Sequence, residues 1–83
     1  MKWKVIWKPE AERSLTLIWL SSRQREAINT AAGELDSALA NDPTTVGESR
    51  EENRRVVFIR PLGARIEIDQ AAHTVSVLTV WKY

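Results

Sequence analysis

The chain has 83 residues, which is enough for one domain and no more. Hydrophobic residues make up 43% and charged residues 28%, a composition typical of a globular protein that excludes a disordered chain. The absence of cysteine excludes disulfides and thiolate metal sites, and no apolar run approaches the roughly 20 residues of a membrane span. The N-terminus has no signal-peptide pattern, so we expect a cytoplasmic protein.

Charge is unevenly distributed along the chain, although the net charge is only +1. Residues 26–48 contain five acidic residues and no base, whereas residues 50–65 contain five arginines and two glutamates. This pattern predicts a molecule with one acidic and one basic side. The alternative is a solvated surface whose uneven charges serve no partner.

The first half of the chain predicts one strand and two helices. Residues 2–8 alternate between lysines and bulky apolar side chains, which is the period of a strand. Pro9 ends this strand and suits the first position of a helix. The apolar stripe of that helix is Ala11, Leu15, Ile18 and Trp19. Ser21 followed by Gln24 is typical of a capping box that opens a second helix. The stripe of the second helix is Ile28, Ala31, Ala32, Leu35, Ala38 and Leu39.

The second half predicts a loop followed by three strands. Residues 41–50 carry breakers and form the loop. Residues 56–59 are a near-continuous apolar run, which is typical of a strand covered on both faces. Residues 65–69 alternate as a strand with one wet face. Residues 74–81 form the last strand, and its apolar phase shifts at Val77-Leu78, which indicates a β-bulge or a central position.

Helices that come early and strands that come in a run indicate the α+β class, with the element order β-α-α-β-β-β. Short turns make the last three strands an antiparallel meander, and the first strand can pair with it at an edge. We therefore expect a single domain, residues 1–83, with a helical hairpin packed on one face of a small, mostly antiparallel sheet. Its core should include Leu15, Ile18, Ile28, Leu35, Leu39, Val57, Ile66 and Val77.

The sequence contains no P-loop, dinucleotide fingerprint, GxSxG or HExxH, so the common catalytic motifs are absent. His73 is the only histidine and falls in a predicted turn, with no second ligand at metal-binding spacing. We expect it to be exposed, and we expect neither a metal nor a cofactor. The four tryptophans are most simply core residues, and the alternative is that at least one lies on an exposed patch that receives a partner.

Basic residues gather on the predicted sheet and at the chain end. They are Arg54, Arg55, Arg60, Arg65 and Lys82, and Tyr83 follows them. Antiparallel strands could bring several onto one open face, where guanidinium groups suit phosphate and an aromatic ring suits an unpaired base. The alternative is that some pair with acidic side chains on the same strands.

Several short segments carry a resemblance by their order and spacing. They are Trp19-Leu20, the alanine-rich helix running into Leu39–Pro43, residues 47–50, Arg54-Arg55, residues 61–63 and Val80-Trp81. Together they resemble the RelE/ParE superfamily, in particular its plasmid-stabilisation-type members, over nearly the whole chain. The resemblance implies a RelE/ParE-like toxin domain of a type II toxin–antitoxin system, with a cognate antitoxin protein as partner.

The resemblance implies two alternative targets. Ribosome-dependent members are mRNA interferases that cut mRNA in the decoding site with basic side chains of the sheet and a C-terminal tyrosine or histidine. ParE-like members block DNA gyrase without catalysis. We expect the first activity, an RNA-binding endoribonuclease that inhibits translation, but whether the chain is an enzyme is left open. A third alternative is an inactive member that only binds its antitoxin.

The resemblance also implies roles for individual residues. The catalytic candidates are Arg54, Arg60, Lys82 and Tyr83, which would stabilise charge on the phosphate and move a proton. Arg55 and Arg65 would bind the substrate, and Trp19 would contact the partner protein. The arginine that nucleases carry at the head of the third strand falls on Gly63. The chain stops at Tyr83, and the nucleases carry further catalytic groups in a segment beyond that point.

Overall fold

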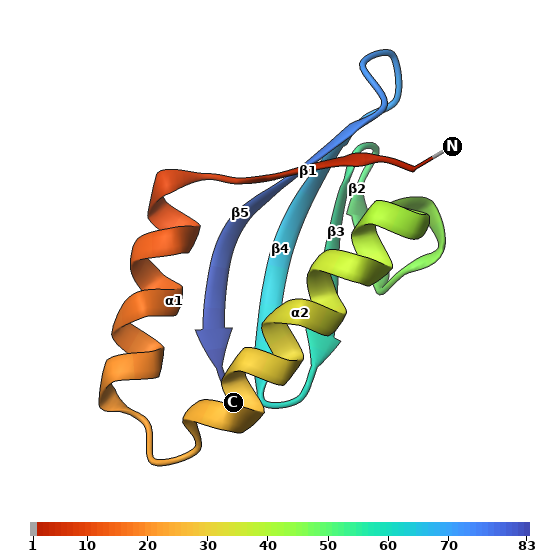
Figure 1. The fold of residues 1–83 in the computed structure, drawn as a ribbon. Helices are drawn as coiled ribbons and strands as arrows, with labels where there is room; N and C mark the ends of the chain where they lie inside the picture. Colours follow the sequence, from red (N-terminus) through yellow and green to blue (C-terminus); the bar gives the residue numbers. More distant parts are fainter. Residues whose placement is uncertain (1) are drawn as a thin grey trace.

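The computed structural model describes residues 2–83, which form two α-helices on a five-stranded sheet (Figure 1). In chain order the elements are β1 (Lys4–Trp7), α1 (Pro9–Ser21), α2 (Arg25–Asn41), the 3₁₀ helix η1 (Pro43–Thr45), β2 (Glu48–Glu51), β3 (Arg54–Ile59), β4 (Leu62–Asp69) and β5 (Thr74–Lys82). The strand order is β1-β5-β4-β3-β2, with β1 parallel to β5 and the other neighbours antiparallel. The predicted α+β architecture is confirmed.

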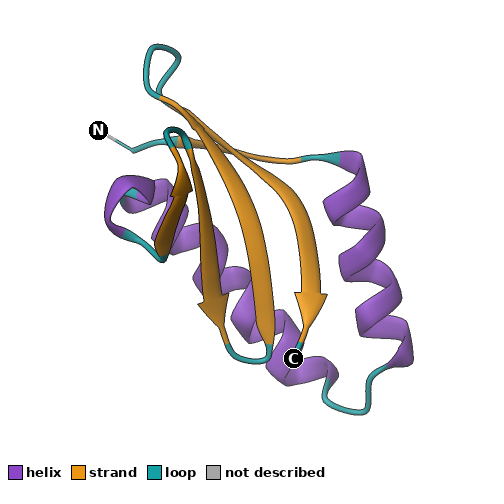
Figure 2. Cartoon of the chain, turned by 180° about the vertical axis from the view of Figure 1, so that it is seen from behind, coloured by secondary structure: helices purple, strands orange, loops and turns teal. Residues whose placement is uncertain are grey.

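Both helices lie on the same side of the sheet (Figures 1 and 2). Helix α1 packs against β5, and α2 packs against β1, β3 and β4. Six of the eight predicted core residues are buried, namely Ile28, Leu35, Leu39, Val57, Ile66 and Val77. Leu15 and Ile18 are partly buried and pack against this core. Neither helix within residues 2–83 is long and apolar enough to cross a membrane.

The junction between the helices differs from the predicted capping box. Helix α1 continues through Ser21, whose hydroxyl donates back to the Leu17 carbonyl at 2.9 Å. Ser22 instead accepts a 2.9 Å hydrogen bond from the Gln24 backbone N–H, and α2 begins at Arg25. The predicted Ser21–Gln24 box is therefore wrong, because the Ser21 hydroxyl is used by the helix that it ends.

The predicted loop 41–50 contains two short elements. Asp42 opens η1 by accepting hydrogen bonds from the backbone N–H and the hydroxyl of Thr44, at 3.0 and 2.6 Å. These two donors lower the pKa of the Asp42 carboxyl below its ordinary value. Strand β2 then adds an edge to the sheet, and all four of its residues are exposed. Its sequence carries no apolar alternation because it buries neither face.

Two further expectations are corrected and one is confirmed. Phe58 lies in the run predicted to be covered on both faces, yet it is 50% exposed because neither helix of residues 2–83 covers the far side of the sheet. His73 is not exposed: it is partly buried, has φ +54°, and stacks on Trp3 with ring centroids 4.0 Å apart. The predicted bulge in the last strand is present, since the pairing with β4 skips Leu78.

Candidate functional site on the open face of the sheet

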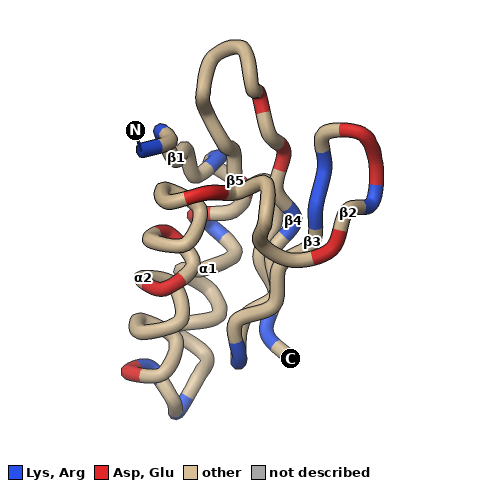
Figure 3. Tube along the Cα trace, turned by 90° about the vertical axis from the view of Figure 1, so that its right-hand side faces the viewer, with Lys and Arg blue, Asp and Glu red and all other residues tan. Residues whose placement is uncertain are grey.

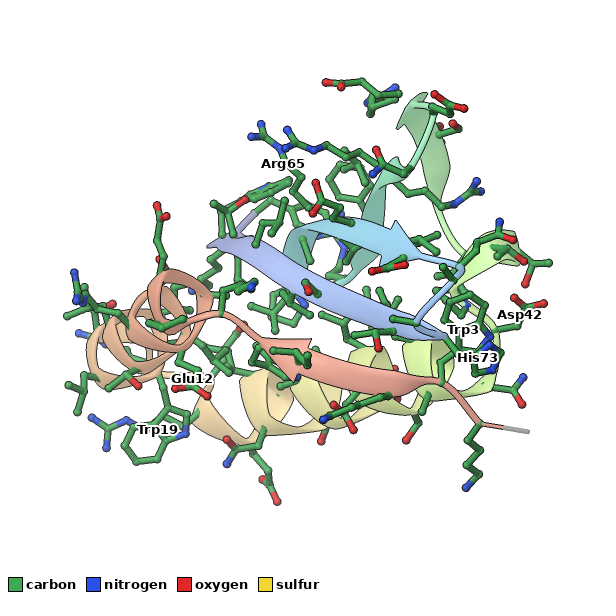
Figure 4. The ribbon with its side chains drawn as sticks, turned by 90° about the horizontal axis from the view of Figure 1, so that it is seen from above. Trp3, Glu12, Trp19, Asp42, Arg65 and His73 are labelled. Carbon is green, nitrogen blue, oxygen red and sulfur yellow. The ribbon has the colours of Figure 1, made fainter. Side chains whose placement is uncertain are left out.

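The side of the sheet away from the helices, called the open face here, is visible in Figure 2. Alternate residues of β3, β4 and β5 point to it, because side chains alternate between the two faces of a strand. By the strand register they include Arg54, Val56, Phe58, Gly63, Arg65, Glu67, Ser76, Thr79 and Trp81. Figure 4 shows Arg65 on the side opposite to both helices.

The cations of the open face differ in their partners. Arg54 Nε donates to Glu67 Oε2 at 3.0 Å across the β3–β4 pair, so the charge of Arg54 already has a partner. Arg50 on β2 is 3.2 Å from Glu48. Among residues 2–83, no ion pair involves Arg60 or Arg65. Arg65 contributes to a hollow of about 270 Å³, whose other lining residues are Arg50, Glu51, Arg54 and Val56.

Three aromatic rings stand beside these cations at the end of the sheet. The ring of Phe58 meets Trp81 and Tyr83 edge-on, with centroid distances of 6.0 and 5.4 Å. The Arg60 guanidinium lies 5.1 Å from the centroid of Tyr83, a cation–π distance. Phe58 is 50% and Tyr83 46% exposed, so a flat ligand could reach them. Phe58 was not among the predicted site residues, although it lies four positions after Arg54 on β3 and therefore points to the same face of the sheet.

The space in which a side chain of residue 63 would lie is occupied by the indole of Trp81. Phe58, Gly63 and Trp81 are paired in one row across β3, β4 and β5. A Cβ on Gly63 would lie 2.5 Å from Cε2 of the Trp81 indole, which therefore occupies the place of a side chain at that position. This is the position at which the resemblance expects an arginine. The open face is thus aromatic at a point where a nuclease would be cationic.

Arg55 and Lys82, two other predicted site residues, lie on the helical side of the sheet. Arg55 donates from Nε to the Val46 carbonyl at 2.6 Å and from a terminal nitrogen to the Gly47 carbonyl at 2.9 Å. It therefore anchors the segment that leads into β2. Lys82 is paired with buried Leu62, so by alternation it points away from the face that carries Trp81.

Trp19, the predicted partner contact, is also on the helical side (Figure 4). It is partly buried, and the Arg25 guanidinium lies 4.5 Å from its ring centroid. Its indole nitrogen is buried and has no hydrogen-bond partner in the part of the chain that the structure describes. Trp19 and the open face therefore belong to two separate surfaces.

One cluster of acidic residues and one cluster of basic residues lie on opposite sides of the molecule. Figure 3 shows acidic residues along α2, and basic residues on β3 and near the chain end on the other side. Acidic residues of β2 lie near the basic cluster, and Arg13 and Arg25 lie on the helices, so neither side carries charges of one sign alone. Within residues 2–83, no group of three or more histidine, aspartate and glutamate side chains is arranged to hold a metal ion.

Solved structures share this fold. A chain in the crystal structure of the toxin–antitoxin complex RelBE2 from Mycobacterium tuberculosis is 19% identical, with a TM-score of 0.80 over 100% of this chain and 93% of that chain. A chain of the chromosomal ParDE TA system from P. aeruginosa is 14% identical, with a TM-score of 0.72 over 96% of this chain and 95% of that chain. No protein-family model and no curated protein matches the sequence. The fold expected for the RelE/ParE superfamily is therefore confirmed.

Proposed function

We propose that this chain is the toxin of a type II toxin–antitoxin pair and that it inhibits translation by cutting mRNA on the ribosome. One observation supports this proposal most directly. The open face carries Arg60 and Arg65 without carboxylate partners among residues 2–83, beside an exposed aromatic cluster that includes Tyr83. Guanidinium groups bind phosphate and exposed rings stack on unpaired bases, so this surface suits single-stranded RNA.

Cleavage of RNA requires activation of a 2′-hydroxyl and stabilisation of extra negative charge on the phosphate. In this proposal, Arg65 binds the phosphate in the hollow beside Val56, and Arg60 stabilises charge next to Tyr83. Tyr83 stacks on a base or transfers a proton. Arg54 is held by Glu67 and lines the same hollow, where it orients the backbone of the substrate.

The remaining predicted residues act less directly. Arg55 supports the site by anchoring the segment before β2, the strand that carries Arg50. Lys82 adds positive charge at the end of the sheet, between Trp81 and Tyr83 in the chain. A cognate antitoxin would neutralise the toxin by laying acidic side chains over the open face. Its affinity at that surface should then weaken as ionic strength rises, because exposed charge pairs are screened.

The second candidate function is inhibition of DNA gyrase without catalysis. It is favoured by the packing of Trp81 on Gly63, which puts an indole where the nuclease resemblance requires a cation. The pairing of Arg54 with Glu67 also favours this function, because it leaves fewer unpaired positive charges to stabilise a transition state of RNA cleavage. A face of aromatic rings with a few cations can bind a protein surface tightly without performing a reaction.

An in-vitro translation assay that also records message integrity separates the two functions. The proposed toxin should stop protein synthesis, and the message should be cut only when ribosomes are present. The same preparation should leave gyrase supercoiling of a relaxed plasmid unchanged. If messages stay intact while supercoiling stops, the gyrase function replaces the one proposed. If neither changes, the chain only binds its antitoxin.

A further inference from the structure

The open face continues from β5 onto β1, the edge strand of the sheet. Val5 and Trp7 of β1 pack against the core, so Lys4 and Ile6 point to the other side of the strand by alternation. Lys4 is exposed and Ile6 is partly exposed. The surface around Arg65 is therefore connected to the lysine of β1 through the face of β5, on the side of the sheet seen in Figure 2.

Three hydroxyl side chains of β5 lie on this face between Trp81 and β1. They are Thr74, Ser76 and Thr79, and the valines at the alternate positions of the strand are buried. Thr74 donates its hydroxyl to the Ala72 carbonyl at 3.0 Å, whereas the hydroxyls of Ser76 and Thr79 donate to no atom of residues 2–83. The stretch from Thr74 to Trp81 is about 23 Å long at the usual rise of a strand. Its free donors can therefore bind a ligand that lies lengthwise on β5.

The opposite direction, from Arg65 over β4 towards the β2–β3 turn, is acidic. A hollow of about 530 Å³ there is lined by three carboxylates, those of Glu52, Glu67 and Asp69. Arg54 lies beside it and is already paired with Glu67. These carboxylates repel the negative charges of a nucleic-acid backbone. By contrast, the residues of β1 and β5 include no acid, and the first eight residues of the chain contain three lysines. Charge therefore distinguishes the two directions in which a strand bound at Arg65 can continue.

We infer that single-stranded RNA bound at Arg65 and Tyr83 continues along β5 and crosses β1, where Lys4 binds a backbone phosphate. The free hydroxyls of β5 donate hydrogen bonds to phosphate or ribose oxygens between the two ends. Ile6 supplies an apolar surface beside Lys4 for a ribose or a base. The inference rests on the proposed function, because it extends the RNA site of the open face by a second subsite. Contacts to the backbone carry no sequence information, so this subsite binds any base sequence.

The lysines at the start of the chain are available for this contact. Lys2, Lys4 and Lys8 are exposed, and within residues 2–83 none of them forms an ion pair. The alternative role of a lysine on an edge strand is to prevent pairing with another chain. That role predicts no effect of Lys4 on RNA binding, so the two roles are separable by experiment.

The test compares a uridine dinucleotide with a uridine oligomer of about eight nucleotides, a length within the usual range of single-strand sites. Binding to the full chain is measured without ribosomes by fluorescence anisotropy. Amide NMR signals locate it, with Arg65 reporting the site proposed above and with Thr74 and Ser76 reporting the new subsite. The dinucleotide should shift the Arg65 signal alone, and the oligomer should shift all three signals.

Variants with matched controls test the individual contacts. Lys4→Gln should weaken binding of the oligomer by roughly two- to fivefold at low salt, the effect of one exposed charge pair. It should also reduce the slope of log affinity against log salt concentration by about 0.7, the value for one phosphate contact of a single strand. Arg13→Gln removes a charge from the exposed side of α1 and should change neither quantity. Ser76→Asp puts a carboxylate on the path and should also weaken binding, whereas Ser37→Asp on the exposed part of α2 should not. Thermal melts confirm that each variant is folded.

Three results would overturn the inference. The first is an oligomer that leaves the signals of Thr74 and Ser76 unshifted, and the second is an equal affinity and salt slope for the wild type and Lys4→Gln. The third is a glutamate oligomer that binds at Lys4 as tightly as the RNA does, because the surface would then accept an acidic protein segment.

Failure of the inference and failure of the proposed function are distinguishable. An oligomer that binds along β5 while messages stay intact on the ribosome supports the subsite and contradicts the proposed reaction. Messages that are cut at the same rate by the wild type and Lys4→Gln, with equal RNA affinity, support the reaction and contradict the subsite.

Discussion

The indole of Trp81 and the α-carbon of Gly63 are packed so closely that a Cβ on Gly63 would lie 2.5 Å from the ring. Gly63→Ala should therefore displace Trp81 and disturb its edge-on contact with Phe58. We expect a loss of about 1–3 kcal/mol in the free energy of unfolding, the usual cost of overpacking. Chemical denaturation followed by tryptophan fluorescence measures it.

Gly33→Ala is the matched control for Gly63→Ala, and it should raise the free energy of unfolding where Gly63→Ala lowers it. Nothing outside the helix and its sequence neighbours would lie within 4 Å of the new methyl group, as judged on residues 2–83. The substitution removes the helix penalty of glycine, so stability should rise by up to about 1 kcal/mol. Equal effects of the two alanines would contradict the packing described for Trp81.

Arg55 and Arg54 are neighbours in the sequence, yet their loss should have unequal effects on stability. Arg55→Ala removes two charged hydrogen bonds to the carbonyls of Val46 and Gly47, and each such bond contributes roughly 1.5–3 kcal/mol. Arg54→Ala removes a half-exposed ion pair with Glu67, which contributes about 0–1 kcal/mol. Urea titration of both variants makes the comparison, and a larger loss in Arg54→Ala would contradict it.

Arg60→Ala tests the catalytic part of the proposal, in which Arg60 stabilises the charge that develops on the phosphate. Removing one preorganised donor from a developing charge lowers a rate by on the order of 10²–10³-fold. We expect that loss in the rate of ribosome-dependent message cleavage, with stability changed by less than about 0.5 kcal/mol. Arg13→Ala is the control, since Arg13 is an exposed arginine on α1. A cleavage rate that is unchanged in Arg60→Ala excludes this arginine from the reaction.

Tyr83→Phe separates the two roles given to this residue. The variant keeps a ring against Phe58 and under the Arg60 guanidinium, and it loses only the hydroxyl. If Tyr83 transfers a proton, the cleavage rate should fall by roughly 10²–10⁴-fold while RNA binding is retained. A variant that cleaves normally leaves Tyr83 with stacking alone, which Tyr83→Ala would then reveal as a loss of binding.

The Asp42 carboxyl should titrate below its ordinary pKa of 3.8, because the hydroxyl and backbone N–H of Thr44 both donate to its charged form. A lowered pKa in the folded state stabilises the fold above the ordinary pKa. That stabilisation is lost as the pH falls through the folded-state pKa. Thr44→Val removes the hydroxyl donor and should raise the pKa towards 3.8. Carbon-detected NMR of the carboxyl measures both values, and identical titrations would rule out the hydroxyl as the main cause.

Periodicity is what made most of the fold predictable. Buried residues such as Ile28, Leu35 and Leu39 recur at helical spacing, so the sequence alone identifies the face of α2 that packs on the sheet. The four residues of β2 carry no such pattern, since both of their faces are wet. Backbone hydrogen bonds to β3 hold these residues in place. Because such bonds do not require particular side chains, the sequence does not reveal them.

The candidate site was predicted only in part, because the sequence of β3 does not alternate between apolar and polar residues. Residues 56–59 are continuously apolar, so the sequence does not reveal which of them faces the helices. That ambiguity extends back to Arg54 and Arg55, which point to opposite sides of the sheet. It also hides Phe58, whose exposure depends on the absence of a second covering layer. Once the register with β4 is known, every one of these side chains is assigned.

The pairing of β1 with β5 joins segments about as far apart in the chain as this domain allows, since Lys4 is opposite Thr74. Contacts of such long sequence separation are costly to close and form late in folding. Strand β5 lies between β1 and β4, so removing it would leave β1 without a neighbour in the sheet. During synthesis, β1 leaves the ribosome before β5 and must wait for it. The open face, which needs Trp81 and Tyr83, is therefore assembled only after β5 and the residue that follows it have been translated.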